Sequence, residues 1–512
     1  MTKQSFIKGA MILVTASFYN RLLGFVYKIM VVRLVGSEGI GIYEMVFPFY
    51  VLILVITSAG VPLAISKLVA EEMAKSNIKG AYKVFYISIM FLTFTGIIVT
   101  MTLYKFLPII VKYFYNDPRV YWSFWVMIPG IFVISVCSAF RGFFQGLQQM
   151  TPTAVSQVIE QSTRFVIGLW CAKSLIKYGV EFASMGMAIG MIAGEMVGII
   201  IMIIFYITKR PKVKTKFLTL THTGSMLSII KAIFYLAFPI TLTRIVYSTS
   251  MTLQASLVPQ RLQAAGFSLR QSTEIFGQYS GIAVTLLHLP TMVTISLAIT
   301  LVPAISEALS KNNNKLVSQR INQALRITFL LGLPSMVIFL LFPFRLSELL
   351  FDTPQAGTPL KILGWGAIFL YLQQTTTGIL QGLGRVKASL YNAACGASVS
   401  LIGVYYLTAI PTLGIQGTAI AANIGAIIVS MLNLLSIIKS VAFHLNFKQT
   451  VLLPLTATFI MGFTAFQLDL YLVSYSPWMI IPILSISSIL YIILLILMKA
   501  INIKRILNLF IR

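Results

Sequence analysis

The sequence predicts an all-α polytopic membrane protein with about 14 transmembrane helices. Apolar residues make up 58% of the 512 positions and charged residues only 10%, and the mean hydropathy is +0.89. A membrane helix uses about 20 mostly apolar residues, so the roughly 300 apolar positions are enough for about 14 spans. A soluble chain of this length would need far more polar surface. The long apolar runs also favour helices over the alternating pattern of a membrane barrel.

The apolar runs divide the chain into fourteen predicted helices. Several of them contain proline, including Pro48 and Pro290, where we expect kinks. The predicted spans are 10–32, 43–66, 82–107, 121–145, 152–176, 183–207, 232–256, 279–305, 323–343, 358–382, 388–410, 413–438, 449–470 and 478–498.

The distribution of basic residues predicts the orientation in the membrane. The chain has 39 Lys and Arg against 13 Asp and Glu, a net charge of +26. With the N-terminus in the cytoplasm, and residues within three positions of a span end assigned to the adjoining loop, 24 of the 39 basic residues fall on the cytoplasmic side, 10 on the outer side and 5 within spans. Cytoplasmic loops of membrane proteins are enriched in this way. We therefore expect both termini in the cytoplasm and a cell-membrane location, and no binding of nucleic acid.

The sequence offers no sign of an enzyme or of a bound cofactor. The longest gap between spans is about 22 residues, too short for an independent domain. No phosphate-binding G-x-x-x-x-G-K-[ST] motif, H-E-x-x-H or G-x-S-x-G occurs. The three cysteines are far apart and lack the spacing of a zinc site. We expect no catalytic residues, no metal and no cofactor, so that any transport is secondary rather than driven by ATP in this chain.

Short words recur in order along the two halves of the chain. Gln145-Gly146-Leu147 reappears 236 residues later as Gln381-Gly382-Leu383, and Gly186-Met187-Ala188-Ile189 resembles Gly417-Thr418-Ala419-Ile420. Because each half holds an even number of spans, the repeats are parallel, an arrangement typical of transporters with a substrate site between the halves. We predict a six-helix half at 1–222, a second at 223–440, and two further helices with a basic cytoplasmic tail at 441–512.

Eight of the charged residues within the predicted spans are candidates for a structural or functional role, since isolated charge is costly there. Glu160 and Arg164 stand four residues apart on one helix face and are a candidate structural ion pair. Arg141 and Glu195 lie near the ends of their spans, so we expect their side chains to reach the membrane interface. The same argument applies to Glu44, which lies close to the start of the second span.

Arg21 and Arg244 are the strongest candidates for substrate binding. Each lies about halfway along the first span of its half, and Lys28 lies two turns beyond Arg21. Cationic groups in a transport cavity favour an anion, and the planar guanidinium suits the paired oxygens of a phosphate. We interpret Asn20, Tyr247 and Gln254, with Gln373 and Gln374, as candidate ligands of sugar hydroxyls. Hydrogen bonding between helices is an equally good interpretation of these polar residues.

Three motifs in the first half resemble a known superfamily. The run Asn20-Arg21-Leu22-Leu23-Gly24-Phe25 is similar to the opening motif of MurJ-type lipid II flippases. The runs Gly60-Val61-Pro62-Leu63-Ala64-Ile65-Ser66 and Phe140-Arg141-Gly142-Phe143-Phe144-Gln145-Gly146 look closer to the stage V sporulation protein B family. Both groups belong to the multidrug/oligosaccharidyl-lipid/polysaccharide exporter superfamily. The MurJ-type motif commonly has Arg-Asp where this chain has Tyr27 and Lys28, a departure that favours the sporulation branch.

The resemblance implies a helical bundle that flips an undecaprenyl-pyrophosphate-linked sugar across the membrane for synthesis of the spore cortex. It also implies that Arg21 is a cavity arginine. The expected partners are the lipid-linked sugar pyrophosphate, membrane lipids and cell-wall synthesis enzymes. Two other functions stay open: a cation-coupled multidrug exporter, which needs an acidic cavity residue such as Glu44, and a scaffold for cell-wall enzymes, which needs no charged cavity.

Overall fold

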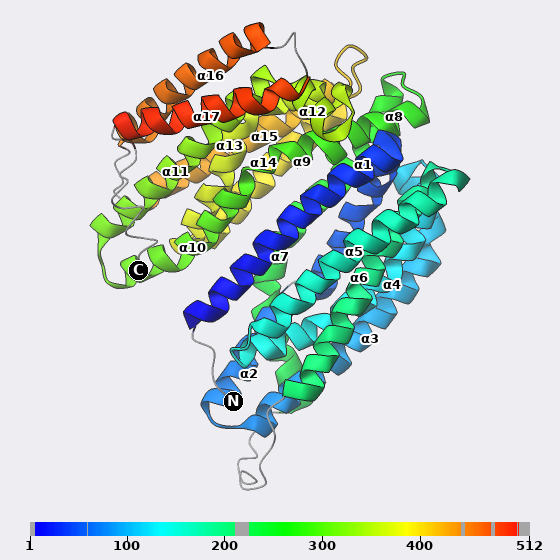
Figure 1. The fold of residues 1–512 in the computed structure, drawn as a ribbon. Helices are drawn as coiled ribbons and strands as arrows, with labels where there is room; N and C mark the ends of the chain where they lie inside the picture. Colours follow the sequence, from blue (N-terminus) through cyan, green and yellow to red (C-terminus); the bar gives the residue numbers. More distant parts are fainter. Residues whose placement is uncertain are drawn as a thin grey trace. The chain divides into compact units, whose positions relative to one another are not determined.

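The computed structural model describes residues 6–58, 60–209, 225–441, 446–472, 477–498 and 500, and its regular elements are helical throughout these ranges. Figure 1 shows the chain as an assembly of long helices. In chain order these begin with α1 (Phe6–Ser58), α2 (Val61–Ala74), α3 (Ile78–Ile110), η1 (Val111–Tyr115), α4 (Val120–Gly146), α5 (Thr151–Leu175), η2 (Ile176–Tyr178), α6 (Val180–Lys209), α7 (Met226–Ala264) and α8 (Leu269–Phe276).

The remaining helices follow α8 in the chain. They are η4 (Gly277–Ala283), α9 (Val284–Leu287), α10 (Thr291–Ser310), α11 (Asn314–Leu341), α12 (Pro343–Phe351), η5 (Pro354–Ala356), α13 (Gly357–Gly382), α14 (Val386–Leu407), α15 (Ile415–Ser440), η6 (Lys448–Leu452), α16 (Leu453–Leu472), η7 (Pro477–Met479) and α17 (Ile480–Leu497).

The predicted fold class is confirmed: the protein is a polytopic, all-α membrane protein. Among the described residues, ten helical stretches are long and apolar enough to cross a membrane. One of them, Met11–Ala74, extends over 64 residues and contains the first two predicted spans apart from residue 10. Helices also occupy the other predicted spans in the described ranges.

Two of the predicted spans are interrupted rather than continuous. The second contains the junction between α1 and α2, where Gly60 packs so closely on α7 that a methyl group there would lie 2.3 Å from the Ala237 carbonyl oxygen. The eighth is divided between η4, α9 and α10. Pro290 stands immediately before α10, and proline has no N–H to continue the hydrogen-bonded ladder. Hydropathy detects the apolar run but cannot detect the interruption of the helix within it.

The chain divides into two compact units, each of which has its own core. The first unit is Met1–Gln260 with Ser268–Gly277, and the second is Arg261–Phe267 with Gln278–Arg512. In the first, Ile65, Phe85, Phe143 and Met202 belong to one buried apolar cluster. In the second, Ile305, Ile321, Leu372 and Ile437 form the corresponding cluster, and α16 packs against α11 and α17. The predicted boundary at 222/223 lies in 210–224, outside the described residues.

The repeated sequence words occupy equivalent structural places. Gly146 ends α4 in contact with Val69 of α2, and Gly382 ends α13 in contact with Ile305 of α10. One turn earlier, a methyl group at Gly142 would lie 2.8 Å from Ile65, and the equivalent Gly378 packs on α10 in the same way. Each glycine permits a close helix crossing, which explains why glycine recurs 236 residues after Gly142 and after Gly146.

Candidate functional site

A cluster of three charges lies inside the first unit, between α4 and α5. Nη2 of Arg141 donates to Oε2 of Glu160 at 2.7 Å, and Nη2 of Arg164 lies 3.7 Å from Oε1 of the same carboxylate. The Glu160–Arg164 contact of the candidate ion pair is therefore present, but Arg141 is the closer partner. A neighbouring helix thus supplies Arg141 with a carboxylate partner that hydropathy cannot detect, and the interface position expected for Arg141 stays a prediction. The three residues together carry one net positive charge.

Glu195 is buried beside the same cluster rather than at the interface. Its side chain is 3% exposed, and the Tyr50 hydroxyl lies 3.0 Å from both of its carboxylate oxygens. A methyl group at Gly130 would lie 2.3 Å from the Tyr50 oxygen. The glycine in α4 therefore makes room for a tyrosine from α1 to reach a carboxylate on α6. Sequence analysis missed Tyr50, since nothing in its local pattern distinguishes it from other tyrosines in the chain.

Lys28 and Glu44 form an ion pair inside the first unit. Both belong to α1, which turns at Gly36, where φ is 77° and ψ is 175°. The turn divides α1 into a first arm with Lys28 and a second arm with Glu44. The two side chains remain 20% and 13% exposed. The carboxylate of Glu44 thus compensates the positive charge of Lys28, and the role of Lys28 in substrate binding stays a prediction.

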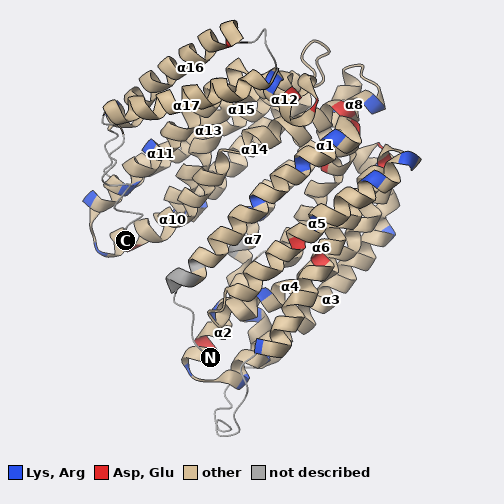
Figure 2. Cartoon of the chain, viewed as in Figure 1, with Lys and Arg blue, Asp and Glu red and all other residues tan. Residues whose placement is uncertain are grey.

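Arg21 and Arg244 are arranged differently from the other charges in the spans. Neither forms an ion pair with a carboxylate among the described residues. Arg244 is exposed on α7, and Tyr247, one turn later, is 57% exposed. Beside Arg21, the buried Oδ1 of Asn20 accepts no hydrogen bond from the described residues. Figure 2 shows most Lys and Arg at helix ends, with a few charged residues part-way along the helices.

The other predicted polar ligands have partners within their own units. Nε2 of Gln254 donates to Oγ of Ser250 at 3.3 Å. In the second unit, Oε1 of Gln374 accepts from Thr294 at 2.7 Å. These bonds match the interpretation of such residues as links within and between helices. Both glutamines retain further hydrogen-bonding atoms for a ligand.

A second network, which sequence analysis did not predict, joins three connections of the first unit. Arg119 before α4 pairs with Glu38 and with Asp117, the latter at 2.8 Å. Arg270 of α8 donates to Glu38 at 2.8 Å, and the Thr273 hydroxyl donates to Asp117 at 3.0 Å. All three connections are predicted on the outer side of the membrane. If successive spans alternate in direction across the membrane, the three connections must lie at the same end of the helices, and these ion pairs join them there.

The surroundings of Arg119 favour its charged form. Burial on its own would lower the pKa of Arg119, but the hydrogen bonds and negative charges of Asp117 and Glu38 raise that pKa above its ordinary value. Asp117 is fully buried, with Arg119 and Thr273 as its partners. The network therefore ties the α1 turn, the α3–α4 connection and α8 together through salt bridges and hydrogen bonds.

Comparison with known proteins identifies the family. The family model described as polysaccharide biosynthesis protein matches residues 6–309, and the one described as MatE matches residues 280–407. Stage V sporulation protein B of Bacillus subtilis (strain 168) is 32% identical over 456 residues, 88% of this chain and 87% of that protein. Lipid II flippase MurJ of the same organism is 26% identical over 490 residues, 89% and 87% of the two chains.

The fold is shared with a solved relative. Lipid II flippase MurJ in an inward closed conformation has a TM-score of 0.67 at 16% identity, over 94% of this chain and 98% of that one. The resemblance read from the Asn20–Phe25 and Phe140–Gly146 motifs is confirmed by these matches. Because the first family model spans more than half of the chain and the sporulation protein matches most of it, the chain belongs to the polysaccharide biosynthesis protein family, in the multidrug/oligosaccharidyl-lipid/polysaccharide exporter superfamily.

Proposed function

We propose that this protein is a secondary flippase that moves an undecaprenyl-pyrophosphate-linked sugar across the cytoplasmic membrane. The substrate is a peptidoglycan precursor like lipid II, and the process it serves is synthesis of the spore cortex. Family membership supports the flippase class, and the names of two relatives, a sporulation protein and a lipid II flippase, support the substrate and the process. We also propose that both termini lie in the cytoplasm, as the distribution of basic residues predicts.

One observation carries the choice of an anionic substrate. Lys28 pairs with Glu44, and Arg141 and Arg164 pair with Glu160, whereas Arg21 and Arg244 have no carboxylate partner among the described residues. An uncompensated charge within a membrane span is costly unless water, a partner or a substrate meets it. A pyrophosphate provides two negative groups whose oxygens match the guanidinium fork. Arg21 and Arg244 are the proposed head-group ligands.

The neighbouring polar groups extend this proposal to the sugar. The unpartnered Oδ1 of Asn20 can accept a hydrogen bond from a hydroxyl group, and the exposed Tyr247 can donate one. Gln254 retains one donor and its carbonyl oxygen beyond the bond to Ser250. Lys28 supports the positive field but is held by Glu44, so we assign it a smaller part than the two arginines.

The same geometry weakens the alternative of a cation-coupled multidrug exporter. That function needs a carboxylate available to a cation, and Glu44 is engaged by Lys28. Glu160 is engaged by two arginines and Glu195 by Tyr50. A scaffold for cell-wall enzymes gives no reason to keep two uncompensated arginines within the spans, where each is costly.

Lipid binding to the purified full-length protein, measured by native mass spectrometry, tests the proposal. Lipid II, phosphatidylglycerol and a cationic dye are offered to the wild type and to the Arg21→Ala/Arg244→Ala double variant. The expected result is retention of lipid II by the wild type and its loss in the double variant, with phosphatidylglycerol retained equally by both proteins. Arg21→Lys keeps the charge but loses the fork, so intermediate retention is expected. Lys387→Gln, at an exposed position in the second unit, is the matched control and should bind as the wild type.

Two results would overturn the proposal. Lipid II retained equally by the wild type and the double variant would show that the two arginines do not hold the pyrophosphate. Preferential retention of the dye would favour the multidrug exporter. The scaffold alternative is tested in sporulating cells, where it predicts normal spore cortex with both arginines replaced and the protein at normal abundance.

A further inference from the structure

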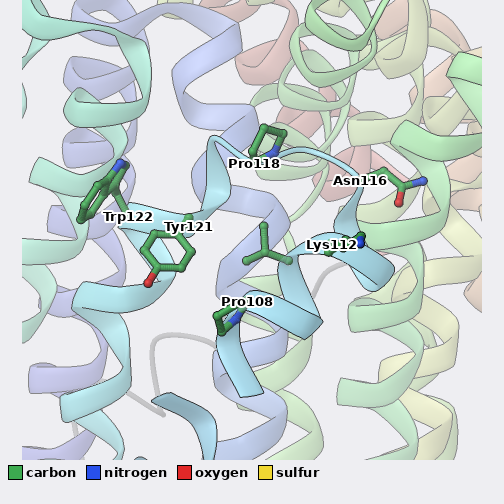
Figure 3. Close-up of a pocket in the computed structure, with 7 residues that line it drawn as sticks. Pro108, Lys112, Asn116, Pro118, Tyr121 and Trp122 are labelled. Carbon is green, nitrogen blue, oxygen red and sulfur yellow. The ribbon is translucent and has the colours of Figure 1, made fainter. Parts of the chain in front are cut away.

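A pocket lies at the junction of α3, η1 and α4, apart from the arginines discussed above. Its volume is about 610 Å³, and its lining includes Pro108, Lys112, Asn116, Tyr121 and Trp122. Figure 3 shows Tyr121 and Trp122 on the α4 side and Lys112 and Asn116 on the opposite side. Both Ile78–Tyr115 and Val120–Gly146 are membrane-length apolar helices, so the pocket lies where two spans reach one face of the membrane.

The backbone around the pocket is held in place by the adjoining loop. Asn116 has a left-handed conformation with φ of 58°, and Pro118 follows two residues later. Between them, Asp117 is fully buried and bound by Arg119 and Thr273. Trp122 stacks on Phe182 of α6 at 6.3 Å between ring centroids and is 43% exposed. The pocket is thus fixed on both sides while its aromatic surface remains accessible.

Lys112 supplies a positive charge that no described carboxylate neutralises. Its Nζ lies 5.2 Å from the centroid of the exposed Tyr113 ring, and it forms no ion pair in the described part of the chain. The neighbouring acid, Asp117, is already engaged by Arg119 and Thr273. The Asn116 amide, Tyr121 hydroxyl and Trp122 indole N–H add hydrogen-bond donors to the lining. One cation with several neutral donors suits a singly charged phosphate diester.

The surroundings favour a lipid as the source of that phosphate. Trp125 follows Trp122 by one turn on α4 and is 45% exposed, and its carbonyl oxygen accepts from the Tyr104 hydroxyl at 3.2 Å. Tryptophan and tyrosine are enriched where membrane helices meet lipid head groups. A lysine at this level attracts anionic lipid, whereas a water-soluble phosphate gains nothing from the adjoining apolar surface.

We propose that this pocket binds the phosphodiester head group of an anionic phospholipid in the leaflet that it faces, which the predicted topology makes the outer one. Lys112 holds the phosphate charge, Asn116 and Tyr121 donate to its oxygens or to the head-group alcohol, and Trp122 packs against the lipid beside it. The site is separate from the proposed pyrophosphate site at Arg21 and Arg244, and it does not depend on the transported substrate.

The test measures phospholipid retention on the delipidated full-length protein by native mass spectrometry. Phosphatidylglycerol and zwitterionic phosphatidylethanolamine are offered in equal amounts. Lys112→Gln is expected to lower retention of phosphatidylglycerol about fivefold, the factor for one cation near an anionic membrane surface, and to leave phosphatidylethanolamine unchanged. Asn116→Asp keeps the size and the left-handed backbone but adds a negative charge, so a loss at least as large is expected.

Matched variants separate this site from other sources of binding. Lys105 lies over Phe106 at 5.9 Å, at the same end of α3 but outside the pocket lining, and Lys105→Gln should retain lipid as the wild type does. The losses should persist in the Arg21→Ala/Arg244→Ala background. Equal losses of phosphatidylglycerol retention in Lys105→Gln and Lys112→Gln would overturn the proposal and favour nonspecific attraction of anionic lipid by the basic residues at this end of α3. Displacement of the lipid by soluble glycerol 3-phosphate would overturn it in favour of a site for free phosphate.

Discussion

Lys28 and Glu44, sixteen residues apart in the sequence, form an ion pair between the two arms of α1. The contact depends on the turn at Gly36, because a continuous helix would separate these residues by about 24 Å along its axis. Lys28, which the sequence predicted to bind substrate, is thereby paired with Glu44, the only carboxylate that the sequence suggested for cation coupling. The pairing is the main structural reason to assign the substrate-binding role to the two unpaired arginines.

Gly36→Ala should destabilise the protein by about 1–3 kcal/mol. The φ of 77° with ψ of 175° belongs almost exclusively to glycine, and no other atom lies within 4 Å of a methyl group there, so the loss comes from the backbone alone. Thermal unfolding in detergent measures it. The control is Gly24→Ala on the same helix, whose methyl group would meet only the side-chain Nε2 of Gln161 at 3.4 Å. Equal melting temperatures for both variants would refute this explanation of the turn.

A double-mutant cycle on Lys28 and Glu44 should reveal favourable coupling of about 1–3 kcal/mol. Lys28→Met and Glu44→Gln each leave one partly buried charge without its partner, whereas the double variant removes both charges. We therefore expect the double variant to be more stable than the sum of the two single changes predicts. Additive losses in unfolding free energy would mean that the pair does not act across the turn.

Gly142→Ala and Gly378→Ala should destabilise their two units by similar amounts, about 1–3 kcal/mol each. A methyl group at Gly142 would lie 2.8 Å from Ile65, and one at Gly378 would lie 2.7 Å from Ala298. Fluorescence-detected size exclusion after heating compares both with Gly24→Ala. Loss in one unit alone would argue against equivalent helix crossings in the two repeats.

Arg119→Gln should destabilise the first unit by the same amount at about pH 6 and pH 9. The pKa of Arg119 is raised in the folded protein above an unfolded value that already lies far above pH 9, so its stabilising charge is fully present at both pH values and is lost only at higher pH. Thermal unfolding at the two pH values makes the comparison. A destabilisation that disappears between them would show that a group other than Arg119 controls the network.

Periodicity and hydropathy were sufficient to predict the fold, because every span must satisfy its backbone within one apolar helix. They did not predict the short helix α12, and at Pro290, where a kink was expected, the helix is interrupted between α9 and α10. Periodicity and hydropathy also cannot predict which residues of different helices come into contact. The partners of Arg141 and Glu195 come from other helices, α5 and α1, so only the packed structure places these charges in the interior. Arg21 differs, because the Asn20–Phe25 motif indicated it as a cavity residue from the sequence alone, although its binding role stays a proposal.

Transport in proteoliposomes tests the central claim most directly. The full-length protein is reconstituted, and movement of lipid II between leaflets is followed for the wild type, for Arg21→Ala/Arg244→Ala and for the Lys387→Gln control at equal protein content. The account predicts transport by the wild type and the control and at least a tenfold loss of transport in the double variant. A tenfold loss corresponds to about 1.4 kcal/mol, and two charge-assisted hydrogen bonds contribute more than that. Undiminished transport by the double variant would contradict it.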